Sequence, residues 1–368
     1  MKKTRVLHII NRLNTGGVER WLLGVAEGLQ DSDIQVDVLV HTEEPSEFDE
    51  AFTATGSKIV KCRYQRDPFS YAWRLYRTLK QNPQYDVIQS HVDHFSGLIM
   101  MVAFFAGIKL RICHSHSNRE NIEPKSGLRV WYLKLMKRLI YWFGNKFLSV
   151  SREAERSLYG DVVPERKREV FYCGLKHLNE VTVNADLKQQ LGLPSSSFIV
   201  GHVGRLSEPK NHSFILKIFA QLRKSVDATL VLVGDGELRP DIEREIQQLG
   251  LGEHVRILGM RSDAVDIMAS VFDVMLFPSL YEGLPLTVVE AQVAGVPILV
   301  ADNITKEAGF TDTLVDYASL DDSLEVWCEK LIKLHRNADN SVAQQRFRDT
   351  DFYMPKHLEN LQQLYQGY

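Results

Sequence analysis

The most informative segment of the chain is residues 277–291, which read FPSLYEGLPLTVVEA. A short apolar strand is expected where the segment begins, a loop then carries Glu282 and Gly283, and Pro285 suits the first turn of a helix. The free backbone N–H groups at such a helix start, with the positive end of the helix dipole behind them, form a site for a phosphate group. Glu290 follows on the same helix, so two carboxylates flank one anion-binding turn. Ionised carboxylates accept hydrogen bonds from the hydroxyls of sugars and riboses.

Short β-branched runs alternate with amphipathic helical patterns along the chain, which predicts βαβ units and parallel sheets. The runs form two similar sets, and residues 173–183 interrupt the periodicity between them. We therefore expect an α/β protein with two Rossmann-like domains, residues 1–175 and 176–345, followed by a C-terminal helix in residues 346–368 that packs back on the body. The expected strands are residues 5–10, 34–40, 87–89, 111–114 and 147–150 in the first domain, and 198–203, 229–233, 255–258, 274–277 and 297–300 in the second.

Composition limits the class of protein. With 44% apolar and 25% charged residues among 368, the chain has the make-up of a folded globular protein. Its longest apolar stretch, residues 95–108, is shorter than the ~20 residues of a bilayer-crossing helix, so we expect a buried helix there. The four cysteines are scattered without a C-x-x-C pair, which argues against a disulfide framework or a zinc site and fits a reducing cytoplasm. Residues 1–172 hold 26 Lys and Arg against 20 Asp and Glu, which indicates an anionic partner or a chance asymmetry.

Glu282 and Glu290, eight positions apart around Gly-Leu-Pro, resemble the E-x7-E motif of retaining glycosyltransferases with the GT-B fold, the group 1 glycosyl transferases. The resemblance covers nearly the whole chain. It implies two Rossmann-like domains whose parallel sheets face each other across a cleft. By this likeness Glu290 holds the ribose hydroxyls of the nucleotide, while Glu282 and the backbone of Gly283 and Leu284 contact the donor sugar.

A second match closes the first strand of the second domain, where residues 201–211 read GHVGRLSEPKN and resemble the family's G-R-L-x-x-x-K-N element. The resemblance implies that Arg205 and Lys210 bracket the donor diphosphate. Negative charge grows there as the sugar departs, and preorganised cations stabilise such charge. Gly234 lies in a turn that the family places near the nucleotide, and Arg261 lies where the family commonly cradles the base.

In the first domain, residues 14–20 read NTGGVER and follow the first expected strand. Glycines allow a tight turn there into a helix, and the resemblance implies that Gly16 and Gly17 lie close to the donor phosphates when the domains shut. The segment is not G-x-G-x-x-G, so a dinucleotide site is poorly supported.

Two histidine-containing segments follow strands of the first domain, at the sheet edge where open α/β sheets bind ligands. The family places a histidine beside the transferred sugar, and His116 is the preferred match, with His114 as the alternative and a structural histidine as a third reading. His91 and His94 are assigned to acceptor contacts or to structure. We expect no metal there, because no third ligand is spaced with that pair. No cofactor is expected elsewhere, since a nucleotide-sugar is a substrate.

Residues 125–146 contain six basic residues and no acidic one, interleaved with an apolar stripe at helical spacing. A basic, aromatic-rich amphipathic helix suits the surface of an anionic membrane. A domain helix that buries its stripe in the core explains the pattern equally well.

The predicted function is transfer of a hexose, with retention of configuration, from a nucleotide-diphosphate sugar to a glycan or lipid-linked acceptor. UDP is the favoured nucleotide, the cytoplasm or the inner face of the cell membrane is the expected location, and no nucleic-acid partner is expected. Resemblance to bacterial transferases of capsule and exopolysaccharide assembly points to surface polysaccharide. The alternatives are a nucleotide-sugar epimerase of the same fold, a hydrolase that uses Glu282 and Glu290 as acid and base, and a non-catalytic sugar-nucleotide binding protein.

Overall fold

The computed structural model describes residues 3–14, 16–64, 67–81, 85–116, 127–160, 162–178, 181–339 and 341–367. The chain divides into two compact units. Unit 1 consists of residues 1–176 and 351–368, and unit 2 consists of residues 177–350. The end of the chain therefore belongs to the first unit.

Unit 1 is built on a seven-stranded sheet in which the strand order is β3-β2-β1-β4-β5-β6-β7 and all pairs are parallel. The direction of the strand order reverses between β1 and β4. The central strands are almost wholly buried, as expected when helices cover both faces of a parallel sheet. The strands are β1 (Thr4–Ile10), β2 (Ile34–Val40), β3 (Ile59–Lys61), β4 (Val87–Ser90), β5 (Leu110–Ser115), β6 (Lys146–Ser149) and β7 (Arg168–Val170).

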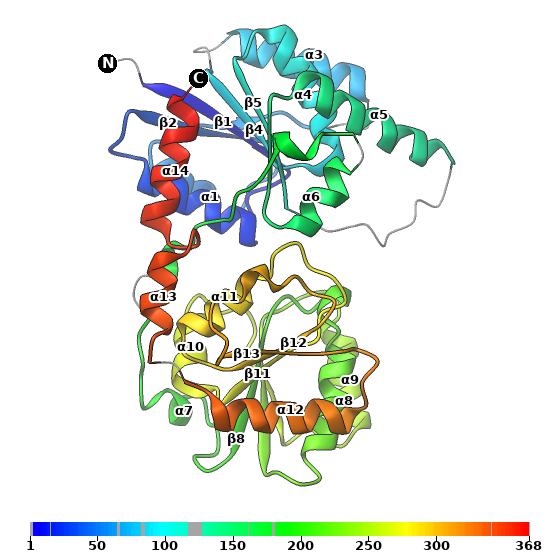
Figure 1. The fold of residues 1–368 in the computed structure, drawn as a ribbon, viewed down its shortest axis with the longest axis vertical. Helices are drawn as coiled ribbons and strands as arrows, with labels where there is room; N and C mark the ends of the chain where they lie inside the picture. The colour runs from blue at the N-terminus through cyan, green and yellow to red at the C-terminus, as the bar shows by residue number, and fades with distance from the viewer. Residues whose placement is uncertain are drawn as a thin grey trace. The chain divides into compact units, whose positions relative to one another are not determined.

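Three helices of unit 1, α3 (Pro68–Gln81), α4 (Ser96–Ala106) and α5 (Gly127–Phe143), lie side by side on one face of this sheet (Figure 1). Helix α4 buries most of its residues, which confirms the buried helix expected at residues 95–108. Helices α1 (Gly17–Gly28) and α14 (Met354–Gln366) contact each other near β1 and β2. The other helices are α2 (Asp49–Ala54), η1 (Asp93–Phe95), α6 (Arg152–Tyr159) and η2 (Glu165–Lys167), and η3 (Lys176–Leu178) lies at the boundary between the units.

Unit 2 repeats the design with a six-stranded parallel sheet in the order β10-β9-β8-β11-β12-β13, which reverses between β8 and β11. The prediction of two Rossmann-like parallel sheets is confirmed. The strands are β8 (Phe198–Val203), β9 (Ala228–Val233), β10 (Val255–Ile257), β11 (Val274–Phe277), β12 (Ile298–Ala301) and β13 (Val315–Ala318). The helices are α7 (Leu187–Gln190), η4 (Glu208–Lys210), α8 (His212–Leu222), α9 (Arg239–Gln248), α10 (Ala264–Val271), α11 (Leu286–Val293), η5 (Lys306–Ala308), α12 (Leu324–Asn337) and α13 (Ala343–Asp349).

The C-terminal segment differs from the single helix expected in residues 346–368. Helix α13 ends at Asp349 in unit 2, and α14 begins at Met354 in unit 1. Of the residues between them, Thr350 and Tyr353 are extended and Asp351 and Phe352 form a turn. The Leu175 N–H donates to the Phe352 carbonyl oxygen at 2.8 Å. This backbone pairing ties the returning chain to unit 1.

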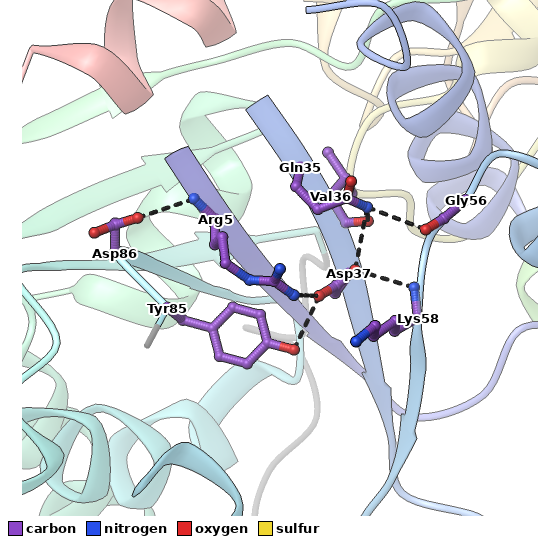
Figure 2. Close-up of polar contacts among 8 residues, drawn as sticks. All are labelled: Arg5, Gln35, Val36, Asp37, Gly56, Lys58, Tyr85 and Asp86. Atoms are coloured by element: carbon purple, nitrogen blue, oxygen red, sulfur yellow. Dashed lines mark hydrogen bonds and ion pairs between the residues drawn. The ribbon is translucent and has the colours of Figure 1, made fainter. Parts of the chain in front are cut away.

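A buried carboxylate joins the first strands of unit 1 (Figure 2). Asp37 on β2 is fully buried and pairs with the guanidinium of Arg5 on β1. The Tyr85 hydroxyl and the Lys58 N–H each donate to its oxygens at 3.0 Å. Burial and the neighbouring carboxylate raise the pKa of Tyr85, so its hydroxyl keeps the proton that it donates. Every oxygen of this carboxylate therefore has a partner, which a buried charge requires.

We predict that Asp37→Ala lowers the free energy of unfolding by about 3 kcal/mol, because it leaves the Arg5 charge buried without its partner. Urea denaturation measures the loss. Asp33→Ala, at an exposed position just before the same strand, is the matched control and should change stability by less than about 0.5 kcal/mol. Equal effects in the two variants would contradict the role given to Asp37.

Candidate functional site

Two of the predicted residues of unit 2, Lys210 and Glu282, lie in loops that meet where its strand order reverses. Strands β8 and β11 are neighbours, and the loops that follow them contain residues 204–211 and 278–285. The carboxyl ends of parallel strands lie at one sheet edge, and the reversal point is where open α/β sheets bind ligands. The Leu280 N–H donates to the Pro209 carbonyl oxygen at 2.8 Å, which holds the two loops together.

Lys210 and Glu282, one from each loop, form an ion pair. The Lys210 Nζ atom lies 2.6 Å from the Glu282 Oε1 atom, and their side chains are only 17% and 16% exposed. The same ammonium lies 4.8 Å from the centre of the Phe277 ring at the end of β11. The carboxylate and the ring face together fix the position of the positive charge.

Glycines bring the backbone of neighbouring loops into close contact. Gly234, which follows β9, has φ +141°, and a Cβ atom on it would lie 2.0 Å from the Gly204 carbonyl oxygen. A Cβ atom on Gly204 would lie 3.2 Å from the Lys210 Cε atom. The lysine chain therefore lies across the end of β8 because no side chain stands there.

The helix expected after Glu282 is present but begins later than predicted. Pro285 is the residue before α11 rather than part of its first turn, and the helix starts at Leu286. Gly283 and Leu284 lie half-buried in the loop, and Glu290 lies half-buried on α11.

Arg205 and Arg261 are paired with carboxylates outside this ion pair. Arg205 is 73% exposed, and its Nη2 atom lies 3.1 Å from the Glu237 Oε2 atom. Arg261 makes two contacts to Asp263, at 2.8 and 2.6 Å. These hydrogen bonds are the main cause of the raised pKa of Arg261. The structure thus brings Lys210 and Glu282 together and leaves the two arginines with other partners.

In unit 1, Gly16 and Gly17 stand at the start of α1, as predicted. A Cβ atom on Gly16 would lie 2.3 Å from the Glu19 Oε2 atom, so the carboxylate of Glu19 lies over this helix start. Burial raises the pKa of Glu19, which favours its neutral form. Sequence reasoning did not single out this carboxylate.

Histidines of β4 and β5 form a cluster at the carboxyl edge of the unit 1 sheet. His91 directly follows β4, His114 lies on β5, and half-buried His116 directly follows β5. The His91 Nδ1 and His116 Nε2 atoms are 2.8 Å apart, and the ring centres of His114 and His116 are 4.2 Å apart. His94 lies in η1, half-buried, outside this set of ring contacts among the described residues.

Side chains from distant parts of the chain complete the cluster. His8 lies on β1, Trp21 on α1, and His357 and Tyr365 on α14. The Trp21 Nε1–H donates to the His357 Nε2 atom at 2.9 Å, and the Trp21 ring contacts those of His91, His114 and His116. These four residues were missed because no local pattern marks them, although His8 lies in an otherwise apolar strand.

His114 and His116, rather than His94, accompany His91, a grouping that spacing in the sequence did not show. Nitrogen atoms of His91, His114 and His116 lie within 4.8 Å of one another, a spacing that admits a metal ion. Each of these rings also makes hydrogen bonds within the protein, and both His91 nitrogens have ring partners.

None of the helices in the described parts of the chain is both long and apolar enough to cross a membrane. Within the basic segment of residues 125–146, residues 127–143 form α5 and Lys146 begins β6, whereas Lys125 lies outside the described residues.

Comparison with known proteins gives matches over both units. The model of the glycosyl transferases group 1 matches residues 183–317, and that of glycosyltransferase family 4 matches residues 15–177. EpsF of Bacillus subtilis (strain 168), whose name assigns it to the glycosyltransferases, is 32% identical over 89% of this chain and 87% of its own. The UDP-Gal:alpha-D-GlcNAc-diphosphoundecaprenol alpha-1,3-galactosyltransferase of Escherichia coli is 28% identical over 79% of this chain and 77% of its own.

Among solved structures, Anabaena Alr3699/HepE in complex with UDP has a TM-score of 0.80 at 20% identity, covering 99% of this chain and 100% of its own. Sucrose-phosphate synthase from Thermosynechococcus elongatus has a TM-score of 0.78 at 17% identity, covering 99% of each chain. At these identities the likeness establishes the fold, and the predicted GT-B class is confirmed.

We predict that stability falls as the pH drops below 6.5. Burial lowers the pKa of His8, His114 and His357 to about 3, so the folded protein keeps these rings neutral while the unfolded chain takes up protons near pH 6.5. The contribution of these rings to the free energy of unfolding should therefore change little between pH 7 and pH 8 and decrease between pH 6.5 and pH 4, by up to about 1.4 kcal/mol per pH unit for each ring.

Urea denaturation followed by tryptophan fluorescence at pH 8, 7, 6 and 5 measures this slope. His357→Gln keeps an acceptor for the Trp21 N–H and removes one titrating ring, so its slope should be smaller by about one proton. A free energy of unfolding that stays flat from pH 6.5 to pH 5 would exclude neutral buried rings.

Proposed function

The chain belongs to the group 1 family of glycosyl transferases, and we propose that it transfers a hexose from a UDP-sugar, with retention of configuration, to a glycan or lipid-linked acceptor. The observation that carries the proposal is the ion pair of Lys210 and Glu282 at the point where the strand order of unit 2 reverses. It presents a fixed cation and a fixed acceptor of hydroxyl hydrogens side by side, and a sugar diphosphate needs both.

We assign donor binding to unit 2. The ammonium of Lys210 has three hydrogens and uses one toward Glu282, so it has hydrogens for phosphate oxygens as well. The carboxylate of Glu282 accepts from the sugar hydroxyls, and that of Glu290 from the ribose hydroxyls. Arg205, Gly234, Arg261 and the backbone of Gly283 and Leu284 complete the proposed donor contacts. For Arg205 this requires exchange of its Glu237 partner for phosphate, which its exposure permits.

The proposed chemistry is substitution on one face of the sugar. The bond between the anomeric carbon and the phosphate oxygen breaks, and the acceptor oxygen bonds to the same face of that carbon. The acceptor's hydroxyl proton passes to an oxygen of the departing nucleotide diphosphate, whose growing charge Lys210 stabilises. No protein nucleophile takes part, because both motif glutamates have binding roles.

We assign the acceptor side to unit 1. His116, half-buried at the carboxyl end of β5, is the proposed contact of the transferred sugar, with His91, His94 and His114 on the acceptor side and Gly16 and Gly17 near the donor phosphates. We propose that no metal takes part, because hydrogen bonds already engage the clustered rings.

We further propose a role in bacterial surface polysaccharide assembly, at the cytoplasmic face of the membrane. The names of several relatives support it, among them the Staphylococcus aureus capsular polysaccharide biosynthesis glycosyltransferase CapH. The epimerase and the non-catalytic reading differ in outcome: an epimerase converts the donor without an acceptor, and a binding protein shows affinity without turnover.

A face of unit 1 supports the proposed contact with an anionic membrane. Among the described residues, 16 large apolar side chains are exposed, and 10 of them lie on the adjacent helices α3, α4 and α5. We call this surface the docking face. Its apolar members are Phe69, Trp73, Tyr76, Phe104, Phe105, Leu128, Trp131, Tyr132, Leu135 and Trp142.

The charges on the docking face all have one sign. Helices α3 and α5 carry seven basic residues, and α3, α4 and α5 carry no acidic one. Helix α5 buries only Met136, Leu139 and Ile140, so most of the apolar stripe expected to enter the core is exposed. Exposed aromatic rings beside basic groups match the interface and charge of an anionic bilayer. The basic residues are Arg74, Arg77, Lys80, Arg129, Lys134, Lys137 and Arg138.

We predict that Lys210→Ala lowers kcat by about 10²–10³-fold, because the departing diphosphate loses its fixed cation. Glu290→Ala should also cripple turnover, through loss of the ribose contact. Hydrolysis and transfer are measured with a panel of UDP-, GDP-, ADP- and dTDP-sugars, of which a UDP-sugar should be preferred. The anomeric configuration of the product is read by NMR.

Arg244→Ala is the matched control, since Arg244 is an exposed cation of unit 2 that pairs with Asp241 on α9. It should retain near-normal turnover. Near-normal turnover in both site variants would remove the assignment, and an inverted product would remove retention. Loss of activity in chelator would contradict the proposal that no metal takes part.

We predict that the protein binds vesicles containing phosphatidylglycerol and not vesicles of phosphatidylcholine alone. Lys134→Gln with Arg138→Gln should weaken binding about 30-fold, since each basic residue near an anionic surface contributes about 1 kcal/mol. Trp131→Ser with Leu135→Ser should weaken it through lost apolar insertion. Sedimentation with vesicles at several salt concentrations measures both effects.

The control for the apolar pair is Val183→Ser with Leu249→Ser, two exposed apolar positions of unit 2. This control should bind vesicles as the parent does. A protein that forms dimers through the docking face and ignores anionic vesicles would refute the membrane contact.

A further inference from the structure

A continuous chain of six hydrogen bonds runs through the histidine cluster of unit 1 and includes a residue of the terminal helix. It begins at the Phe171 carbonyl oxygen and ends at the ring of His116. In order, the bonds join Phe171 O to His114 Nε2 (3.3 Å), His114 Nδ1 to Gln89 Nε2 (3.0 Å), Gln89 Oε1 to the Tyr365 hydroxyl (2.6 Å), that hydroxyl to His8 Nε2 (3.3 Å), His8 Nδ1 to His91 Nε2 (2.9 Å) and His91 Nδ1 to His116 Nε2 (2.8 Å).

The hydrogen bonds between Phe171 and Tyr365 can run in only one donor-to-acceptor direction. A carbonyl oxygen only accepts, so the Nε2 atom of His114 carries the hydrogen toward Phe171. Burial lowers the pKa of His114 to about 3, so the ring is neutral and its Nδ1 atom is an acceptor. The amide nitrogen of Gln89 donates to that atom, and its amide oxygen therefore faces Tyr365.

The Tyr365 hydroxyl sets the same direction for the hydrogen bonds that continue through His8, His91 and His116. Its single hydroxyl hydrogen goes to the Gln89 amide oxygen at 2.6 Å, because that oxygen cannot donate. The Tyr365 oxygen then accepts from the Nε2–H of His8. With its hydrogen on Nε2, a neutral His8 has a bare Nδ1 atom, which accepts from the Nε2–H of His91.

The hydrogen bond between His91 and His116 has the same direction as the one between His8 and His91. The bare Nδ1 atom of His91 accepts from the Nε2–H of His116, so the Nδ1 atom of His116 is left as an acceptor. The Cys173 Sγ atom lies 4.0 Å from it, and burial raises the pKa of this thiol, so the neighbour is a weak donor and not an anion.

We propose that Tyr365 is a positioning residue that fixes the tautomer of His116, with the hydrogen on Nε2 and an accepting lone pair on Nδ1. The lone pair suits a ligand that offers a hydroxyl hydrogen, such as a sugar. That ligand assignment rests on the proposed function, whereas the tautomer itself does not.

Removing the Tyr365 hydroxyl has different effects on the hydrogen bonds on its two sides. In Tyr365→Phe, His114 and Gln89 keep their direction because the Phe171 carbonyl still sets it. His8 loses its partner, so the rings of His8, His91 and His116 are able to carry their hydrogens in either direction. His114 is thus an internal control for the other three rings.

The tautomers are measured by long-range ¹⁵N–¹H NMR of the full-length protein labelled in histidine, with each ring assigned by single His→Gln variants. In the parent all four rings should carry the hydrogen on Nε2. In Tyr365→Phe the signals of His8, His91 and His116 should show both tautomers, while those of His114 stay unchanged. Tyr353→Phe removes a hydroxyl just before the same helix and should leave all four rings as in the parent.

A parent protein with the His116 hydrogen on Nδ1 would overturn the proposal, and so would unchanged rings in Tyr365→Phe. Stoichiometric metal in the purified protein, seen by elemental analysis, would also overturn it. Should Tyr365→Phe fail to fold, Gln89→Leu gives the second test, because it removes the hydrogen bonds that join His114 to Tyr365 through the Gln89 amide.

Activity provides a separate readout. If both directions are equally populated in Tyr365→Phe, half of the molecules present the accepting Nδ1 atom to the transferred sugar, and the apparent KM for the sugar donor should rise about twofold. The KM for the acceptor should not change. A parent without transferase activity would refute the proposed function and leave the NMR test intact.

Discussion

All strands of a parallel sheet end at the same edge, and both candidate sites depend on this constraint. In unit 2 it places Lys210, which follows β8, beside Glu282, which follows β11, although they are 72 positions apart. In unit 1 it places His91, which follows β4, beside His116, which follows β5, and beside His8 on β1. The helices that cover the sheets bury the strands and so keep these edges fixed.

The two edges hold their polar groups by different means. At the edge of unit 2 the polar side chains form a partly exposed ion pair, and in the proposed function a diphosphate shares its cation with Glu282. At the edge of unit 1 the rings are neutral, and hydrogen bonds link them directly or through Gln89 and Tyr365. The edge of unit 2 thus holds a charged pair, and the edge of unit 1 holds directional hydrogen bonds between neutral groups.

Much of the fold and of the unit 2 site could be predicted because short stretches of the sequence indicate them. Apolar runs marked the central strands, and the spacing of Glu282 from Glu290 marked the loop and helix between them. The short edge strands β3, β7 and β13 were missed, because three or four half-buried residues leave no apolar run. The contributions of Trp21, His357 and Tyr365 could not be predicted, since they follow from packing of the terminal helix, which one sequence does not show. The direction of the hydrogen-bond chain likewise depends on a backbone carbonyl, which every residue possesses.

The return of the terminal helix to unit 1 has a consequence for synthesis on the ribosome. Unit 2 is an uninterrupted stretch of the chain, so all its residues are made before residues 351–368. Unit 1 is made first, yet until residues 351–368 follow it lacks the partner of Trp21 and the hydroxyl beside Gln89. Part of its interior therefore stays uncovered while unit 2 is being made.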